Sequence, residues 1–240
     1  MTIKDKVILI TGGAKGIGLA TALKFSLENQ VIVIDSDYVA CNKLTNDNIK
    51  VYSEDIANYS SMDTILKEIY TIYGNIDILI NNAAVQTVNN ISSLTLDDWQ
   101  KVIEVNLTAT FYITQFVANR MIKGNTILNL ISTHYDKPRV DKLHYDVSKA
   151  GVALFTKGYA IELAKKRVTI NALAIGATYT PMNNEFNVNP KIANEAKEKI
   201  PLKYISTPDD IANHIYNIIN NFSDATTGSI FMVDGGRNLI

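Results

Sequence analysis

Tyr145 and Lys149 stand four residues apart in the segment Tyr-Asp-Val-Ser-Lys, and Ser132 lies a short way upstream. On a helix, residues at i and i+4 share one face, so the Lys149 ammonium can lie beside the Tyr145 phenol and favour its ionised form. Such a tyrosine can donate and accept a proton near neutral pH. The spacing also occurs by chance in many helices, so its meaning depends on the motifs around it.

The segment TGGAKGIG, residues 11–18, follows a short apolar run and opens an amphipathic one. Glycines let the backbone approach a pyrophosphate closely, and the N-terminus of a helix offers free N–H donors and the positive end of its dipole. The alternative, a stray glycine turn, does not account for a strand before the turn and a helix after it. We therefore predict a nucleotide-binding turn with cofactor contacts from Gly12, Lys15, Gly16, Ile17 and Gly18.

Asp35 ends the second apolar run, about twenty residues after the glycines, where a carboxylate can accept hydrogen bonds from an adenosine ribose. It would repel the 2′-phosphate of NADP by about 4 kcal/mol at 4 Å and an effective dielectric near 20. NAD is therefore the predicted cofactor. Lys15 could pair with a 2′-phosphate instead, although Asp35 is nearer the ribose. Asp55 and Ile56 are placed to cap the adenine, with a surface aspartate as the alternative.

Length and composition predict one soluble, cytoplasmic domain spanning residues 1–240, since single α/β domains often reach this size. Lys plus Arg number 23 against 24 Asp plus Glu, so the chain has no basic field for nucleic acid. Cys41 is the single cysteine, which excludes an intramolecular disulfide or a cysteine-built zinc site. No cluster of acidic and histidine residues has metal-site spacing, and no apolar stretch is long enough to span a membrane.

Short apolar runs rich in Ile and Val alternate with amphipathic stretches along the chain, which predicts a Rossmann-type α/β fold. In this fold a doubly wound parallel sheet carries helices on both faces. The predicted strands are 7–10, 31–34, 76–80, 126–131, 168–173 and 229–233, and the predicted helices are 17–28, 62–73, 96–121, 145–165 and 208–220. The polar segment 183–200 has weak periodicity, and we expect it to be a mobile substrate lid.

The chain resembles the short-chain dehydrogenase/reductase family over essentially its full length. The matching residues are TGGAKGIG, Asp35, Asp55, Asn81-Asn82-Ala83-Ala84, Asn106, Ser132, Tyr145 with Lys149, Asn171 with Gly176, Thr180-Pro181-Met182 and Val233-Asp-Gly-Gly236. The resemblance implies that Ser132 and Tyr145 hold the reacting oxygen. It also implies that Lys149 binds the nicotinamide ribose and lowers the tyrosine pKa, and that Asn106 anchors a water relay.

Three of these assignments also have a physical reason. Ser132 ends a predicted strand at the carboxyl edge of the sheet, where open α/β sheets bind ligands. Asn106 lies mid-helix, where Asn is a poor helix former, which suits a buried hydrogen-bonding role; the alternative in so Asn-rich a chain is an exposed surface asparagine. Thr180 could bond the nicotinamide carboxamide or cap the turn before Pro181. Asn82 and Ala83 follow the fourth predicted strand and are further expected cofactor contacts.

The sequence departs from the family pattern in three places. Ala84 stands where glycine is common, so its Cβ would crowd a close backbone approach unless φ stays negative. Ile175 replaces a usual proline, and Glu28-Asn29-Gln30 lacks a glycine. None of these positions carries a reacting group, so we expect altered loop geometry and retained activity.

The leading hypothesis is an NAD-dependent oxidoreductase that interconverts a secondary alcohol and a ketone, with Tyr145 as general acid/base. The alternatives are an NADP-linked 3-ketoacyl-type reductase of the same family and a non-catalytic nucleotide-sensing protein. The expected walls of the substrate site are Gln86 and Thr87, residues 134–143, and residues 183–200, where Arg139, His134 and His144 could bind an acidic or polyhydroxy substrate. Surplus apolar residues on the helix at 145–165 predict a homodimer or homotetramer.

Overall fold

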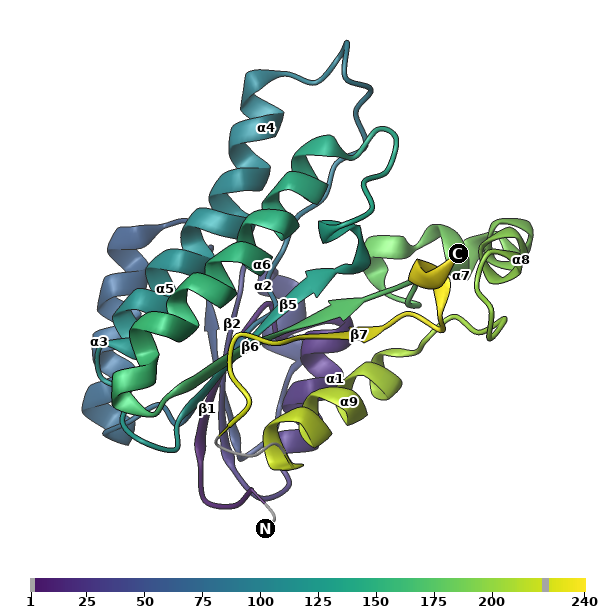
Figure 1. Cartoon of the computed structure of the whole chain (residues 1–240). Coiled ribbons are helices and arrows are strands. Elements are labelled where there is room, and N and C mark those ends of the chain that lie inside the picture. The colour runs from purple at the N-terminus through teal and green to yellow at the C-terminus, as the bar shows by residue number, and fades with distance from the viewer. Residues whose placement is uncertain (1–2, 222–224) are drawn as a thin grey trace.

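The computed structural model describes residues 3–221 and 225–240, and these form a seven-stranded parallel sheet with helices on both faces (Figure 1). The strand order is β3-β2-β1-β4-β5-β6-β7. The chain winds outward in one direction from β1 to β3 and then in the other from β4 to β7, so the winding reverses between β1 and β4. Parallel sheets of this order bind ligands in the crevice outside the carboxyl ends of the strands at that reversal.

The central strands are mostly apolar because both faces of the sheet are covered. In β1, Leu9 faces one core together with Ile32, while Ile8 and Ile10 face the other core. All of these side chains are fully buried. The strands are β1 (Val7–Thr11), β2 (Gln30–Asp35), β3 (Ile49–Ser53), β4 (Ile78–Asn81), β5 (Thr126–Ser132), β6 (Thr169–Ile175) and β7 (Ile230–Val233).

The helices fall into two layers and one outlying group (Figure 1). α3, α5 and α6 cover one face of the sheet, and α1 and α9 cover the other. α7 and α8 lie beyond the carboxyl ends of the strands. The α-helices are α1 (Gly16–Phe25), α2 (Tyr38–Lys43), α3 (Tyr59–Tyr73), α4 (Leu96–Ile103), α5 (Ala109–Ala118), α6 (Leu143–Leu163), α7 (Glu185–Val188), α8 (Pro190–Glu198) and α9 (Pro208–Asn221).

The predicted fold class is confirmed, with three differences in detail. The strand β3 was not among the predicted runs because Lys50 interrupts it and its side chains are only partly buried at the sheet edge. The predicted helix at 96–121 is divided into α4 and α5 by a π-helical turn at Glu104–Thr108. The short helices α2, α7 and α8 were not predicted, and the last two show that the segment at 183–200 is largely helical.

The structure accommodates two of the residues that depart from the family pattern. Ala84 is not among the non-glycine residues with positive φ in the described chain, so its Cβ does not meet the expected crowding. Asn29 stands in the segment that lacks the usual glycine. Its Nδ2 donates to the Phe25 carbonyl at 3.0 Å and its Oδ1 accepts from the Lys6 amide at 3.1 Å. Asn29 therefore joins the end of α1 to the start of β1.

Candidate active site

A cavity of ≈ 630 Å³ opens at the carboxyl ends of the strands, where the winding of the sheet reverses. Most of the predicted site residues line this cavity: Gly12, Lys15, Gly16, Ile17, Asp35, Asp55, Ile56, Asn82, Ala83, Ser132, Tyr145, Lys149 and Thr180. The structure thus brings together residues that are up to 168 positions apart, from Gly12 to Thr180. Gly18 and Asn106 do not line the cavity. Gly18 packs against the carbonyl of Gly12, and Asn106 hydrogen-bonds the loop after β4.

The glycine turn is shaped to receive a phosphate group. Gly12 and Gly16 have φ values of +65° and +52°, which residues with a Cβ rarely adopt. A Cβ at Gly18 would meet the Gly12 carbonyl oxygen at 2.1 Å, so this third glycine lets the helix pack against the turn. No side chain caps the start of α1 at Lys15. The first N–H groups of α1 are therefore available to an anion in the cavity, which fits the pyrophosphate of a dinucleotide.

Asn82 holds the loop after β4 against the glycine turn. Its Nδ2 donates to the carbonyl oxygens of Thr11 and Gly12 at 3.0 and 2.6 Å. In return, the Thr11 hydroxyl accepts from the amides of Asn82 and Ala83 at 3.1 and 3.2 Å. The Asn82 side chain therefore shapes the cofactor turn from behind, and Asn82 and Ala83 border the cavity along this loop.

Asp35 places its carboxylate where β2 meets the glycine turn. Its Oδ2 accepts from the Ala14 amide and its Oδ1 from the Asp37 amide, both at 2.9 Å. Lys15 forms an ion pair with Asp37, and this hydrogen bond is the largest cause that raises the Lys15 pKa. The Lys15 charge is thus already compensated within the protein. Two carboxylates and one ammonium surround this part of the site.

One end of the cavity is bordered by Asp55 and Ile56, the residues predicted to cap the adenine. The Asp55 carboxylate is exposed and accepts from the Ala57 amide at 2.9 Å, whereas the Ile56 side chain is buried. At the other end Thr180 caps the short helix Pro181–Asn183, accepting from the Asn183 amide at 3.3 Å. Thr180 thus has the predicted capping contact, and it also borders the cavity.

The reactive residues come together from β5 and α6. Ser132 is the last residue of β5, and its Oγ accepts from the His134 amide at 3.2 Å. Tyr145 and Lys149 lie one turn apart on α6 and are both buried. The Lys149 Nζ donates to the Leu130 carbonyl at 3.0 Å and lies 5.7 Å from the centroid of the Tyr145 ring. The predicted i, i+4 pairing therefore exists.

The pKa values of this pair are set by burial. Burial raises the pKa of Tyr145 to about 12, against smaller lowering effects of the Arg139 charge and a hydrogen bond with Ser132. Burial also lowers the pKa of Lys149 to about 8. The expectation that Lys149 lowers the Tyr145 pKa is not met in this structure. The reason is that the ammonium is directed at the Leu130 carbonyl and desolvation of the phenol dominates.

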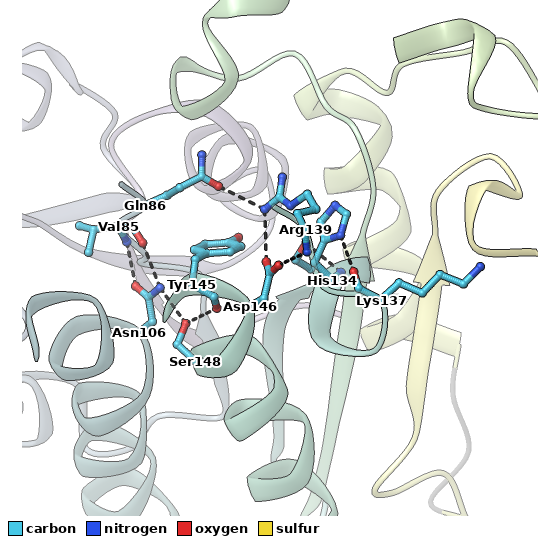
Figure 2. Close-up of polar contacts among 10 residues, drawn as sticks. Val85, Gln86, Asn106, His134, Lys137, Arg139, Tyr145, Asp146 and Ser148 are labelled. Atoms are coloured by element: carbon cyan, nitrogen blue, oxygen red, sulfur yellow. Dashed lines mark hydrogen bonds and ion pairs between the residues drawn. The ribbon is translucent and has the colours of Figure 1, made fainter. Parts of the chain in front are cut away.

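Asn106 lies in the π-helical turn between α4 and α5, and its side chain is almost wholly buried. Its Oδ1 accepts from the Val85 amide at 2.8 Å, and its Nδ2 donates to the Val85 carbonyl at 3.0 Å and to the Ser148 hydroxyl at 3.1 Å. Ser148 in turn donates to the Tyr145 carbonyl at 2.6 Å (Figure 2). Asn106 thus joins the loop after β4 to the turn of α6 that carries Tyr145. Such π-turns often occur at functional sites.

The sequence did not predict the contact between Arg139 and Asp146. Asp146 follows Tyr145 directly, and its carboxylate is 3% exposed. It accepts from the Arg139 backbone amide at 2.6 Å and lies 3.4 Å from the Arg139 Nη2. The same Nη2 lies 3.4 Å from the Gln86 Oε1 (Figure 2). An acidic residue beside the reactive tyrosine was the available signal, but its partner depends on a loop that sequence patterns do not place.

Only some of the residues expected to form the walls of the substrate site line the cavity. Gln86, His134 and Arg139 line the cavity. His144 does not, because it is fully buried with its Nε2 2.6 Å from the Thr87 hydroxyl. Thr87 and His144 are therefore structural partners, and the interpretation of His144 as a substrate ligand is wrong.

Comparisons with known proteins place the chain in a family. The model described as enoyl-(acyl carrier protein) reductase, which belongs to the short-chain dehydrogenase/reductase family, matches residues 12–238. The chain is 33% identical over 248 residues to the (2S)-[(R)-hydroxy(phenyl)methyl]succinyl-CoA dehydrogenase subunit BbsD of Thauera aromatica, covering 100% of this chain and 99% of the relative. It is 32% identical over 251 residues to the 3-oxoacyl-[acyl-carrier-protein] reductase FabG of Aquifex aeolicus, covering 98% of each.

A solved structure of 4-hydroxyisoleucine dehydrogenase complexed with NADH has a TM-score of 0.92 and 28% identity to this chain, with 98% of this chain and 100% of the neighbour covered. The chain therefore belongs to the short-chain dehydrogenase/reductase family, as its resemblance indicated, and is an NAD(P)-dependent enzyme acting on CH–OH groups. Within residues 3–221 and 225–240, no helix is long and apolar enough to cross a membrane.

Proposed function

We propose that the protein is an NAD-dependent oxidoreductase that interconverts a secondary alcohol and a ketone. The observation that supports this most directly is that Tyr145, Ser132 and Lys149 line the same cavity as the glycine turn and Asp35. NAD bound there would supply the hydride acceptor, or the donor in the reverse direction, at its nicotinamide ring. Asn106 keeps this turn of α6 in register with the loop after β4.

The protein's part in the reaction is to hold the reacting oxygen and to move its proton. Ser132 and Tyr145 line the same cavity, and Ser132 lowers the pKa of Tyr145 slightly, so both hydroxyls can face one substrate oxygen. With a pKa of about 12, Tyr145 is protonated at neutral pH and can donate its proton to the oxygen of a ketone. In alcohol oxidation the tyrosinate oxygen accepts that proton. Lys149, with a pKa of about 8, can bind a ribose hydroxyl through its ammonium group.

The charges around Asp35 favour NAD over NADP. A 2′-phosphate would meet Asp35 together with Asp37, while the Lys15 ammonium is already paired with Asp37. Two unit charges about 4 Å apart repel by roughly 4 kcal/mol at an effective dielectric near 20, which corresponds to several hundredfold in affinity. A ribose hydroxyl has no such cost and can donate to the carboxylate.

The cofactor preference is tested by measuring dissociation constants of NAD and NADP for wild type and Asp35→Ser. Serine keeps one acceptor oxygen for the turn but removes the charge, so we expect the ratio of NADP to NAD affinity to rise by at least tenfold. Asp47→Ser is the matched control, because Asp47 is an exposed aspartate that does not line the cavity. Tighter binding of NADP than of NAD by the wild type would refute the proposal.

The similarity to a 3-oxoacyl-[acyl-carrier-protein] reductase favours one other candidate, an NADP-linked 3-ketoacyl-type reductase. The same affinity measurements distinguish the two, since that enzyme would bind NADP more tightly. A non-catalytic nucleotide sensor has no need of Ser132, Tyr145 and Lys149 together in one cavity. Turnover of a panel of secondary alcohols with NAD, followed as NADH at 340 nm, tests that alternative.

We also propose a homodimer or homotetramer, active in the cytoplasm. On α6, Leu154 and Ile161 are 72% and 76% exposed and lie seven residues apart, so they share one face. Phe111 of the neighbouring α5 is 41% exposed and its ring stacks edge-on against Phe155 of α6. An apolar strip of this kind on two adjacent helices fits a symmetric contact between subunits.

A further inference from the structure

Arg139 reaches the substrate end of the cavity with donor groups to spare. Its carbon Cζ lies 5.7 Å from the centroid of the Tyr145 ring, and in Figure 2 its side chain lies on the hydroxyl side of that ring. The side-chain contacts of the guanidinium among the described residues both fall on Nη2, and both are 3.4 Å long. The Nε atom is buried without a hydrogen-bond partner in the described chain. Arg139 lines the cavity, so its guanidinium has N–H groups left for a further acceptor.

The position of Arg139 is fixed before any substrate arrives. Its backbone amide donates to the buried Asp146 carboxylate at 2.6 Å, and Asp146 lies on α6 directly after Tyr145. The backbone amide ties the loop, and the 3.4 Å contact between Nη2 and the Asp146 Oδ1 ties the guanidinium, to the same helical turn as the proton donor. Gln86 approaches from the loop after β4, so its amide borders the same space.

The charged groups that act on His134 and Lys142, two neighbours of Arg139, carry more positive than negative charge. The groups that act electrostatically on His134 and Lys142 are the cations Arg139 and Arg237 and the carboxylates Asp146 and Glu185. With Lys142 itself, three cations face two carboxylates. The repulsion from Arg139 lowers the pKa of both His134 and Lys142, in addition to the effect of burial. A bound monoanion would balance this surplus of positive charge.

We propose that Arg139 binds a carboxylate of the substrate, and that the substrate is a small hydroxy acid or the corresponding keto acid. This inference rests on the proposed function, because it places the carbinol oxygen on Tyr145 and Ser132. The planar guanidinium offers N–H donors in a fork that matches a carboxylate, and Arg139 lines the cavity. Because Arg139 lies so near the Tyr145 ring, only a few bonds separate the carboxylate from the carbinol carbon.

Binding to the enzyme–NADH complex tests the inference without turnover. Calorimetry gives first the affinity of NADH and then the affinity of a hydroxy acid for the loaded enzyme, in which the alcohol cannot react. The probes are 2-hydroxybutyrate, 3-hydroxybutyrate and 4-hydroxypentanoate, each with its uncharged methyl ester. We expect at least one acid to bind on the order of 10- to 100-fold more tightly than its ester.

Arg139→Gln should remove this preference, leaving acid and ester with similar affinities and NADH binding nearly unchanged. Arg139→Lys, which keeps the charge but loses the planar fork, should retain part of it. Arg167→Gln is the matched control: it makes the same change of charge at an exposed position just before β6, at the opposite edge of the sheet. Melting curves of all variants show whether each is folded.

Equal binding of acids and esters by the wild type, or no binding of any acid to the NADH complex, would overturn the carboxylate assignment alone. An equal loss of acid and ester affinity in Arg139→Gln would also overturn it, since Arg139 would then act only by holding Asp146 in place. If the wild type does not bind NADH, the proposed function fails, and the inference fails with it. Substrate turnover of the preferred acid, with kcat/KM lowered in Arg139→Gln, completes the test.

Discussion

Replacing Lys149 with methionine should stabilise the protein while removing its activity. The Lys149 ammonium is buried, and its pKa is about 8 against an ordinary value of 10.5. That difference means that keeping the charge in the folded state costs about 3 kcal/mol near neutral pH. Methionine has a similar length and no charge, and the lost hydrogen bond to the Leu130 carbonyl offsets about 1 kcal/mol of the gain. The free energy of unfolding should therefore rise by about 2 kcal/mol, or roughly 5 °C in Tm.

The stability difference between Lys149→Met and wild type should change with pH in one direction only. Between pH 8 and 10.5 the unfolded chain holds a proton on Lys149 that the folded chain has lost, so wild-type stability from this group rises with pH. Below pH 8 both states are protonated and the full cost is present. The advantage of Lys149→Met should therefore be largest at pH 7 and decrease as pH approaches 10.5. The ionisation of Tyr145, present in both proteins, largely cancels in the comparison.

Urea unfolding of both proteins without NAD, at equal protein concentration, measures the difference at pH 7 and pH 9.5. Lys123→Met is the control, because Lys123 is an exposed turn residue whose replacement should change stability by less than about 0.5 kcal/mol. A Lys149→Met protein that is less stable than wild type at pH 7 would refute the assigned cost of burial. So would an advantage that stays constant between the two pH values.

Three further outcomes are expected. Tyr145→Phe should lower turnover by roughly 10²–10⁴-fold or more with NAD affinity nearly intact, because the ring stays and only the proton donor is lost; near-wild-type turnover would remove Tyr145 from the mechanism. Hydrogen exchange in residues 183–200 should slow when NAD and substrate bind, whereas strong protection throughout the free protein would indicate a fixed wall. Light scattering should show a dimer or tetramer. The double variant Leu154→Glu/Ile161→Glu should dissociate into smaller species, because both side chains lie on the proposed interface. A monomeric wild type would contradict that interface.

The sequence was sufficient to predict the fold because its local signals agree. The glycine turn at residues 11–18 separates a buried strand from a helix, and later Ile- and Val-rich runs repeat that alternation. Parallel strands bring their carboxyl ends to one edge, so Ser132, at the end of β5, could be placed beside the cavity from its position alone. What this reasoning missed was β3, in which Lys50 breaks the apolar run.

The sequence predicted which residues form the site better than it predicted how their charges interact. The i, i+4 spacing placed Tyr145 and Lys149 together, but it does not fix the direction of a long side chain. In the structure the Lys149 ammonium bonds the Leu130 carbonyl, and burial of the phenol dominates the pKa of Tyr145. The weak periodicity of the segment at 183–200 predicts a mobile lid, yet Ala193 and Ile200 bury a small core there with Ile205. Contacts of this kind depend on tertiary packing, which one sequence does not specify.

Two loops that border the cavity are tied to one turn of α6. Asn106 joins the loop at Val85, and hence the adjacent Gln86, to Ser148 on that helix. From the other side, Asp146 holds Arg139. Because these contacts are buried or partly buried, they tie both loops to the turn that carries Tyr145, the proposed proton donor. A substrate held by its carboxylate would thus meet a proton donor whose distance from the anion site is already fixed, which is the condition for efficient orientation of a small molecule.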